Sequence, residues 1–244
     1  MASPGNWAFP DSLQPSPDET RFDLAAALDA VVLLRAEIPE DAFTAQILGT
    51  ERAGNGIVIR DDGLVLTIGY LITEAESIWL TTNRGTVVQG HVLGYDQATG
   101  FGLVLPLGKL GVQPLARGSA AAANTGAPVI VIGQGGRAHS LKAKIVAKRE
   151  FAGYWEYVLD EALFTAPAHP QWGGAALLGE DGSACREVRD RGRSSHKHES
   201  LMRYIYSRTS CDGTSSHDIF MSQYDRKWRG DRYDKISTLY QYCI

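Results

Sequence analysis

Short runs of strand-forming residues, each ended by a tight-turn sequence, recur along the chain from residue 54 onward. Two such runs joined by a turn with a glycine, such as RDDG (60–63) or Asn83-Arg84-Gly85, are typical of a β-hairpin. We therefore predict two antiparallel hairpins and a further strand in this region. The runs are GIVI (56–59), LVLT (64–67), SIWLTT (77–82), TVVQGHVLGY (86–95) and FGLVLPL (101–107).

A second set of runs follows an alanine-rich link, SAAAANTGA (119–127). Two sets of short, evenly spaced strands predict an all-β protein built as two barrels, with the link near residues 116–127. FDLAAALDAVVLLRAEI (22–38) is ambiguous between a helix and a buried strand, and residues 1–21 are predicted to be disordered. The runs of the second set are PVIVIG (128–133), LKAKIVAKRE (141–150), YWEYVLD (154–160) and AALLG (175–179).

The composition changes abruptly near residue 184. Residues 1–184 hold 28 alanines and all 10 prolines, whereas residues 185–244 hold neither residue type. Lys and Arg number 12 against 20 Asp and Glu before the break, and 12 against 8 after it. We interpret residues 22–184 as the folded domain. The basic Ser/Arg/Tyr-rich segment 185–244 is either a genuine appendage or an out-of-frame translation, and we favour the second as a hypothesis.

Four segments resemble, in order and at plausible spacing, the HtrA/DegP-like family of trypsin-fold serine proteases. GNGIVIRDDGLVLTIGYLI (54–72) is similar to the family stretch G-S-G-V-V-I-x-x-D-G-x-I-L-T-N-A-H-V-V, which carries the catalytic histidine. The other three are similar to the stretch with the aspartate, a P-L-x-x-G stretch and the stretch around the nucleophile. They are GYDQATGFGLVLPL (94–107), PLARGSAAAANTGAPVIVIGQGG (114–136) and TAPAHPQWGGAALLGEDG (165–182).

The resemblance implies two six-stranded antiparallel barrels packed perpendicular to each other, with the active site in the cleft between them. If the tail is out of frame, the second barrel lacks its closing strands. The PDZ domain that usually follows in HtrA proteins is not recognisable in this sequence.

The same alignment places Tyr70, Gly100 and Gly173 where the family has its catalytic histidine, aspartate and serine. A tyrosine hydroxyl ionises near pH 10, which makes it a poor general base at neutral pH. Gly100 offers no carboxylate to orient a base, and Gly173 offers no nucleophile. Ordinary triad proteolysis is therefore not expected of this chain.

The loop of the nucleophile is altered as well. It consists of Gln171, Trp172, Gly173, Gly174 and Ala175, where the family has G-N-S-G-G. Gln171 replaces a glycine that lets the backbone turn an N–H toward the oxyanion hole. Trp172 adds a large apolar surface that we expect to pack against a neighbouring loop. These five residues are the candidate binding residues.

A rebuilt active site is not indicated elsewhere. His91 lies in an alternating strand, His169 occupies a family asparagine position that suggests a loop hydrogen bond, and Asp61 and Asp62 form a hairpin tip. Asp96 and the hydroxyls of Thr165 and Ser183 complete no hydroxyl–base–carboxylate set. The pair His196 and His198 and the three cysteines match no metal-site spacing, so neither a metal nor a cofactor is expected. The cysteines are Cys185, Cys211 and Cys243.

The composition argues against two kinds of partner, nucleic acid and a membrane. A formal net charge of −4 argues against nucleic acid, and no apolar run is long enough for a membrane helix. Met1 to Thr20 is polar and proline-dotted, unlike a secretory signal. We expect a cytoplasmic protein, or a periplasmic one if the true N-terminus lies upstream. The preferred function is a pseudoprotease that binds peptide or unfolded protein. The alternative functions are a serine endopeptidase with a displaced site and a non-functional product. The sequence leaves open whether the protein forms a homo-oligomer.

Overall fold

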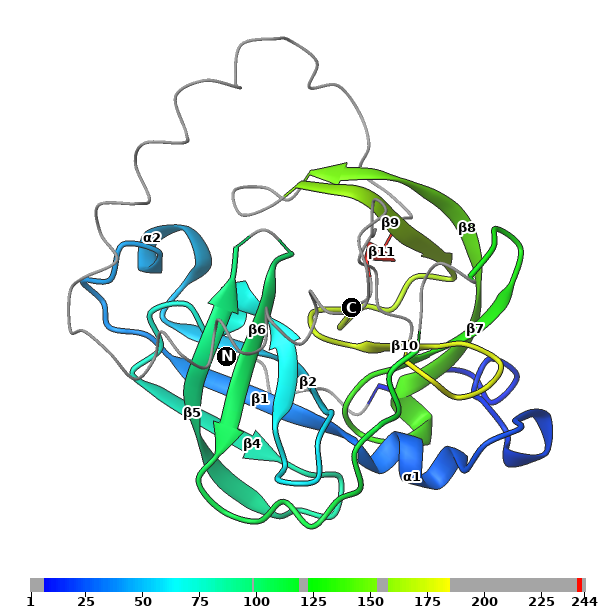
Figure 1. The fold of residues 1–244 in the computed structure, drawn as a ribbon, viewed down its shortest axis with the longest axis horizontal. Helices are drawn as coiled ribbons and strands as arrows, with labels where there is room; N and C mark the ends of the chain where they lie inside the picture. The colour runs from blue at the N-terminus through cyan, green and yellow to red at the C-terminus, as the bar shows by residue number, and fades with distance from the viewer. Residues whose placement is uncertain (1–6, 98, 119–122, 153–157, 185–240, 243–244) are drawn as a thin grey trace, which may run out of the picture.

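The first half of the protein is a closed barrel of six antiparallel strands (Figure 1). The computed structural model describes residues 7–97, 99–118, 123–152, 158–184 and 241–242. The strand order is β1-β2-β3-β6-β5-β4, and pairing of β1 with β4 closes the barrel. Both predicted hairpins are confirmed as the pairs β2–β3 and β4–β5. The strands are β1 (Val31–Glu37), β2 (Glu51–Val58), β3 (Val65–Ile68), β4 (Ser77–Thr81), β5 (Val87–Asp96) and β6 (Phe101–Pro106).

The second half is a curled sheet that stays open within the described residues (Figure 1). Its strand order is β10-β7-β8-β9-β11, and β11 pairs with β9 only at Phe164 and Thr165. This half-barrel is the incomplete second barrel that the sequence predicts. Apart from β11, the segment 185–244 lies outside the described residues. The strands are β7 (Pro128–Ile132), β8 (Ser140–Ala152), β9 (Val158–Ala166), β10 (Ala176–Leu178) and β11 (Gln241–Tyr242).

The ambiguous segment 22–38 contains both a helix and a strand. The helix α1 (Leu24–Asp29) begins at Asp23, whose carboxylate accepts the backbone N–H of Ala26 at 3.0 Å, and β1 follows directly. No helix in the described parts of the chain is long and apolar enough to cross a lipid bilayer. The remaining helices are α2 (Ala45–Leu48) and the 3₁₀ turns η1 (Pro17–Glu19), η2 (Gly69–Leu71) and η4 (Arg137–His139).

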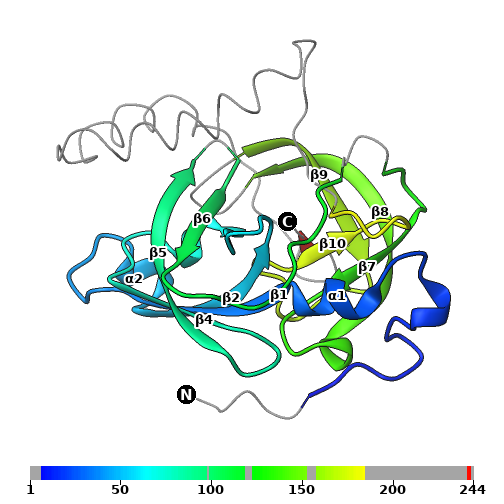
Figure 2. The ribbon, with the colours of Figure 1, turned by 60° about the horizontal axis from the view of Figure 1, so that its bottom comes forward.

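The buried apolar side chains form three groups, two of which span both halves of the protein. One fills the closed barrel and extends to β9, and a second lies inside the curled sheet. The third joins α1, β1 and β2 to β7 and β10, where Figure 2 shows α1 lying along the junction of the two sheets. Its buried members are Ala27, Ala30, Val31, Ile57, Leu115, Ile132, Ala176 and Leu178.

The N-terminal segment 1–21 is predicted to be disordered, and its residues 1–6 lie outside the described residues. From residue 7 onward it runs along the second sheet: Phe9 N–H donates to the carbonyl of Ala138 at 2.9 Å, and Lys142 N–H donates to the carbonyl of Leu13 at 2.7 Å. The Nζ of Lys142 also pairs with Glu19 at 2.9 Å. The polar composition of the segment does not reveal these contacts, because their partners lie far along the chain.

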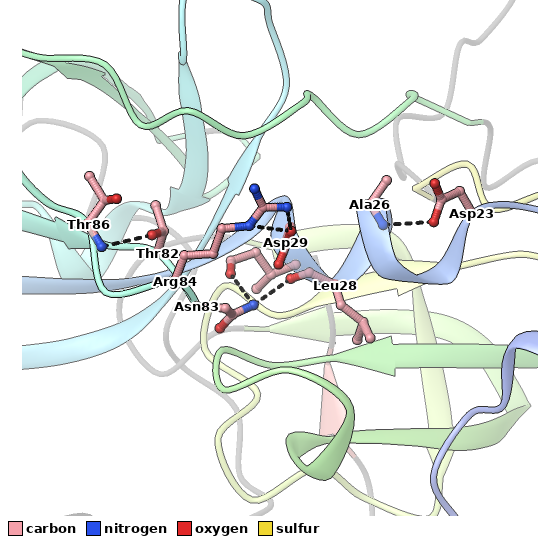
Figure 3. Close-up of polar contacts among 9 residues, drawn as sticks. Asp23, Ala26, Leu28, Asp29, Thr82, Asn83, Arg84 and Thr86 are labelled. Atoms are coloured by element: carbon pink, nitrogen blue, oxygen red, sulfur yellow. Dashed lines mark hydrogen bonds and ion pairs between the residues drawn. The ribbon is translucent and has the colours of Figure 1, made fainter.

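Two asparagine side chains of the first half hold the turn that follows β7. The Oδ1 atom of Asn55 accepts the N–H of Gln134 at 2.7 Å, and the Oδ1 atom of Asn83 accepts the N–H of Gly135 at 2.9 Å. Figure 3 shows the other side of Asn83, where its Nδ2 donates to the carbonyl of Leu28 at 2.7 Å. Asn83 thus connects the β4–β5 turn both to α1 and to the second sheet.

Replacing each asparagine by alanine should show that burial of the side chain decides how much stability is lost. We expect Asn55→Ala to lower the free energy of unfolding by about 3 kcal/mol, because Asn55 is buried and its loss leaves the Gln134 N–H and the Gln171 carbonyl without this partner. Asn83→Ala should cost about 1 kcal/mol, because the exposed groups that it frees can bond to water. Urea denaturation at neutral pH measures both values, and equal costs would contradict this account of the junction.

Candidate functional site

Tyr70 and Gly100 lie side by side at the end of the first barrel. Tyr70 is the middle residue of η2, the turn that directly follows β3. The N–H of Gly69 donates to the carbonyl of Gly100 at 2.7 Å. Gly100 has a φ of +74°, a conformation that glycine adopts readily. The ring of Tyr95 fills the space that a side chain at Gly69 would need.

Gly173 faces Tyr70 across the junction of the two halves. A Cβ atom at position 173 would overlap the hydroxyl oxygen of Tyr70, so the tyrosine side chain fills the space of the missing one. The structure therefore brings Tyr70, Gly100 and Gly173 into one place, as the alignment implies. That these positions are equivalent to a catalytic triad stays a prediction.

Asn55 fixes the loop that carries Gly173. Its side chain is buried, and Nδ2 donates to the carbonyl oxygens of Gln171 at 2.7 Å and Gly173 at 2.9 Å. The backbone N–H of Asn55 donates to the same Gly173 carbonyl at 2.8 Å. Gly174 has a φ of +73°, and a Cβ there would overlap the carbonyl of Asn55. The loop can approach β2 this closely only with a glycine at that position.

A cleft of about 260 Å³ opens beside this loop. Of the five predicted binding residues, Gln171, Trp172 and Gly173 line it, whereas Gly174 and Ala175 are buried and support the loop from beneath. Trp172 is half-buried and packs against the core of the barrel, whereas the sequence predicts packing against a neighbouring loop. The other lining residues are Leu33, Ala53, Gly54, Asn55, Tyr70, Gln134 and Pro170.

His169 forms the loop hydrogen bond that the sequence predicts. Its Nε2 lies 2.8 Å from the carbonyl of His139 and therefore donates, while its Nδ1 accepts the N–H of Gln171 at 3.0 Å. Burial, opposed by the bond to His139, lowers the pKa of His169 below its usual value. His169 is thus neutral at pH 7, and its Nδ1 already holds the N–H of Gln171.

The N-terminal segment packs onto His169 and onto its hydrogen-bond partner His139. The ring of Trp7 stacks on His139 at 4.5 Å between centroids, and its carbonyl lies 2.7 Å from Nε2 of His139. Trp7 and Phe9 also meet His169 edge to face, at 5.8 and 5.3 Å. The N-terminal segment is therefore part of the wall behind the loop 169–173.

A buried arginine supports Tyr70 from the opposite side. Arg52 donates to the carbonyls of Tyr70 at 2.6 Å and Thr73 at 3.0 Å, and to the hydroxyl of Thr44 at 2.7 Å. Thr44 in turn donates to Glu74. Burial alone would raise the pKa of Glu74. Hydrogen bonds from Thr44 and Phe43 and the charge of Arg52 outweigh this effect, so the pKa lies below its usual value and the carboxyl group is ionised.

The remaining candidate residues do not assemble into a second site. His91 is exposed on β5, and Asp96 accepts the hydroxyl of Thr99 at 2.7 Å. Thr165 is buried on β9, and Ser183 donates to Asp181. Asp62 pairs with Arg60 at the predicted hairpin tip.

Within the described residues no three His, Cys, Asp or Glu side chains come together as a metal site. His196, His198 and the cysteines lie outside the described residues.

The sequence analysis did not single out Asn55, Arg52, His139 or Trp7. Asn55 carried a signal, because it stands in G-N-G where the family pattern has G-S-G. Arg52, His139 and Trp7 carried none, since their partners are distant in sequence.

Comparison with known proteins places this geometry in a family. The family model of the trypsin-like peptidase domain matches residues 54–185, more than half of the chain. The chain therefore belongs to the trypsin-like peptidase family. No curated protein sequence matches it.

Solved structures agree on the fold. The HtrA-type protease AlgW with a tripeptide is similar with a TM-score of 0.56 at 16% identity, over 77% of this chain and 65% of AlgW. AlgW with a decapeptide gives a TM-score of 0.52 at 16% identity, over 76% and 68%. An inactive form of Rv3671c from M. tuberculosis gives 0.53 at 19% identity, over 78% and 95%. The fold is thus the trypsin-like double barrel, with an incomplete second barrel, and the chain spans about two thirds of AlgW.

Gly173→Ala tests the shared space between Tyr70 and Gly173. The added methyl group should lower the free energy of unfolding by about 1–2 kcal/mol, because it forces the Tyr70 ring to move. In a Tyr70→Phe background, which lacks the overlapping oxygen, the cost should fall by about 1 kcal/mol. A double-mutant cycle by urea denaturation measures this coupling, and identical costs in both backgrounds would refute the contact.

His169 should make stability depend on pH. Because burial lowers its pKa in the folded state, the unfolded chain binds a proton more readily and stability falls as pH drops from about 7 to 5. His169→Gln should flatten this slope, whereas His91→Gln, at an exposed position, should leave it unchanged. Thermal unfolding of the three proteins across this pH range measures the effect. An unchanged slope in His169→Gln would rule out His169 as the source of the pH dependence.

Proposed function

We propose that this protein is a non-catalytic homologue of HtrA-type serine proteases that binds an extended peptide or an unfolded protein segment in the cleft beside Trp172. The observation that carries the proposal is the place of the Tyr70 hydroxyl, which fills the side-chain space of Gly173. The central position of the cleft is thus occupied by a weakly acidic phenol rather than by a nucleophile and its base.

The chemistry of the loop supports the same conclusion. Hydrolysis of a peptide bond needs a nucleophile, a base that titrates near neutral pH, and N–H groups directed at the developing oxyanion. Gly173 supplies no nucleophile. The N–H of Gln171 donates to His169 instead of pointing into the cleft. Both features favour binding over reaction.

The two imidazoles nearest the loop are engaged elsewhere. The ring nitrogens of His139 lie against the carbonyl oxygens of Gln134 and Trp7, at 3.0 and 2.7 Å. Those of His169 contact only the backbone of His139 and Gln171. A histidine whose two nitrogens bond to the backbone is not placed to activate a serine or threonine hydroxyl, which argues against an endopeptidase with a displaced site.

Peptide binding is supported by the shape of the cleft and by the similar structures. The cleft is lined by strand backbone, amide side chains and Trp172, a combination that suits an extended chain. AlgW, an HtrA-type protease of the same fold, has been solved with a tripeptide and with a decapeptide. Extending that property to this chain is part of the proposal.

Isothermal titration calorimetry with extended peptides and with a denatured protein tests the proposal. We expect saturable binding that Trp172→Ala weakens about tenfold, because the indole supplies the largest apolar surface of the cleft. Val146→Ala, at an exposed position on β8 in the second sheet, is the control and should leave binding unchanged. The absence of saturable binding at millimolar peptide would refute the proposal.

A parallel assay separates this function from proteolysis. We expect no cleavage of fluorescent casein and no labelling by a fluorophosphonate probe. Labelling of any serine would restore the endopeptidase hypothesis.

A further inference from the structure

The cleft beside Trp172 is lined entirely by uncharged residues. Its ten lining residues include three amide side chains, those of Asn55, Gln134 and Gln171, but no acid and no base. A charged side chain that entered this cleft would lose water without meeting an opposite charge, which is costly. The lining therefore selects against acidic and basic side chains in a ligand.

The size and walls of the cleft favour an aromatic side chain. Its volume of about 260 Å³ exceeds the ~150 Å³ cavity that holds a benzene molecule. Trp172 and Tyr70 provide two ring surfaces, and Leu33 and Pro170 provide aliphatic ones. Aromatic rings gain stacking energy against such walls beyond what the buried area alone gives.

The strand register continues this surface across the outside of the barrel. Arg35 on β1 lies opposite Ala53 on β2, which lines the cleft, and opposite Trp79 on β4. Leu34 and Leu80, the neighbours of Arg35 and Trp79, are buried in the barrel, so the row of Ala53, Arg35 and Trp79 faces outward.

Trp79 is a large apolar side chain on this outer row. Its exposed fraction is 42%, which is high for a tryptophan. It lies two strand spacings from Ala53, about 10 Å, a span that three residues of an extended peptide cover. The methylene stem of Arg35 lies between them and can cover apolar ligand atoms while its guanidinium stays in water.

We propose that the ligand of this protein is an extended peptide with an uncharged aromatic side chain in the cleft and a second apolar side chain on Trp79, about three residues away. This inference rests on the proposed function and specifies its ligand. Trp172 and Trp79 are then the specificity-determining residues, one for each side chain. Arg35 separates the two contact points.

Fluorescence polarisation with the full chain tests the inference. The probes are fluorescein-labelled ten-residue peptides of Gly, Ser and Thr that vary at one position among Trp, Leu, Gln, Asp and Lys. A second series adds a Leu three residues further on. We expect the Trp peptide to bind at least tenfold more tightly than the Asp and Lys peptides. The added Leu should tighten binding several-fold, and Trp79→Ala should abolish that gain.

Leu33→Glu provides a test that does not depend on removing a large side chain. Leu33 is half-buried on the outward face of β1 and lines the cleft, so a glutamate there brings a carboxylate to the binding site. We expect this variant to prefer the Lys peptide over the Trp peptide. Ile47→Ala, at an exposed position on α2, is the control and should keep the affinities and their order.

The outcomes separate the two proposals. Equal affinity for all peptides of the first series, or an unchanged order in Leu33→Glu, would overturn the inference and leave peptide binding intact. No binding by any peptide would overturn both. An undiminished gain from the added Leu in Trp79→Ala would overturn the second contact point.

Discussion

The side chain of Asn55 is the contact through which the two halves of this protein set each other's geometry. It accepts the N–H of Gln134 from the turn after β7 and donates to the carbonyls of Gln171 and Gly173 from the loop before β10. The side chain of Asn55 is buried, and leaving its polar atoms without these partners would be costly. The barrel therefore cannot shift against the second sheet without breaking several of these bonds at once, and the loop inherits its position from β2.

That position explains how the residues of the candidate site fit together. Tyr70 reaches into the space that Gly173 leaves empty, and Gln171 gives its N–H to His169. Together these contacts form a packed and hydrogen-bonded surface. Such a surface suits a binding protein, because binding needs a fixed shape and does not need a group that changes protonation during a reaction.

The surroundings of the site show how far its support extends. Arg52 holds the carbonyl of Tyr70 from the side of α2, and Trp7 packs on His139 from the N-terminal segment. These supports come from opposite directions and meet at the loop 169–173 through Tyr70 and His169. Arg52 and Glu74 do not line the cleft: Arg52 donates to the Tyr70 carbonyl and the Thr44 hydroxyl, and Glu74 accepts the N–H groups of Phe43 and Thr44.

The sequence by itself determined most of the strands and the pairing of the two hairpins in the first barrel. These features are local: alternation of buried side chains and glycine-permitted turns repeat within a few residues. Only the tertiary structure decided the contacts of the N-terminal segment with the second sheet, the roles of Asn55 and His139, and the burial of Gly174 and Ala175. Asn55 lies 116 residues from Gln171, and Trp7 lies 132 from His139. Contacts over such separations arise from the packing of whole sheets against each other, which no local pattern of residues records.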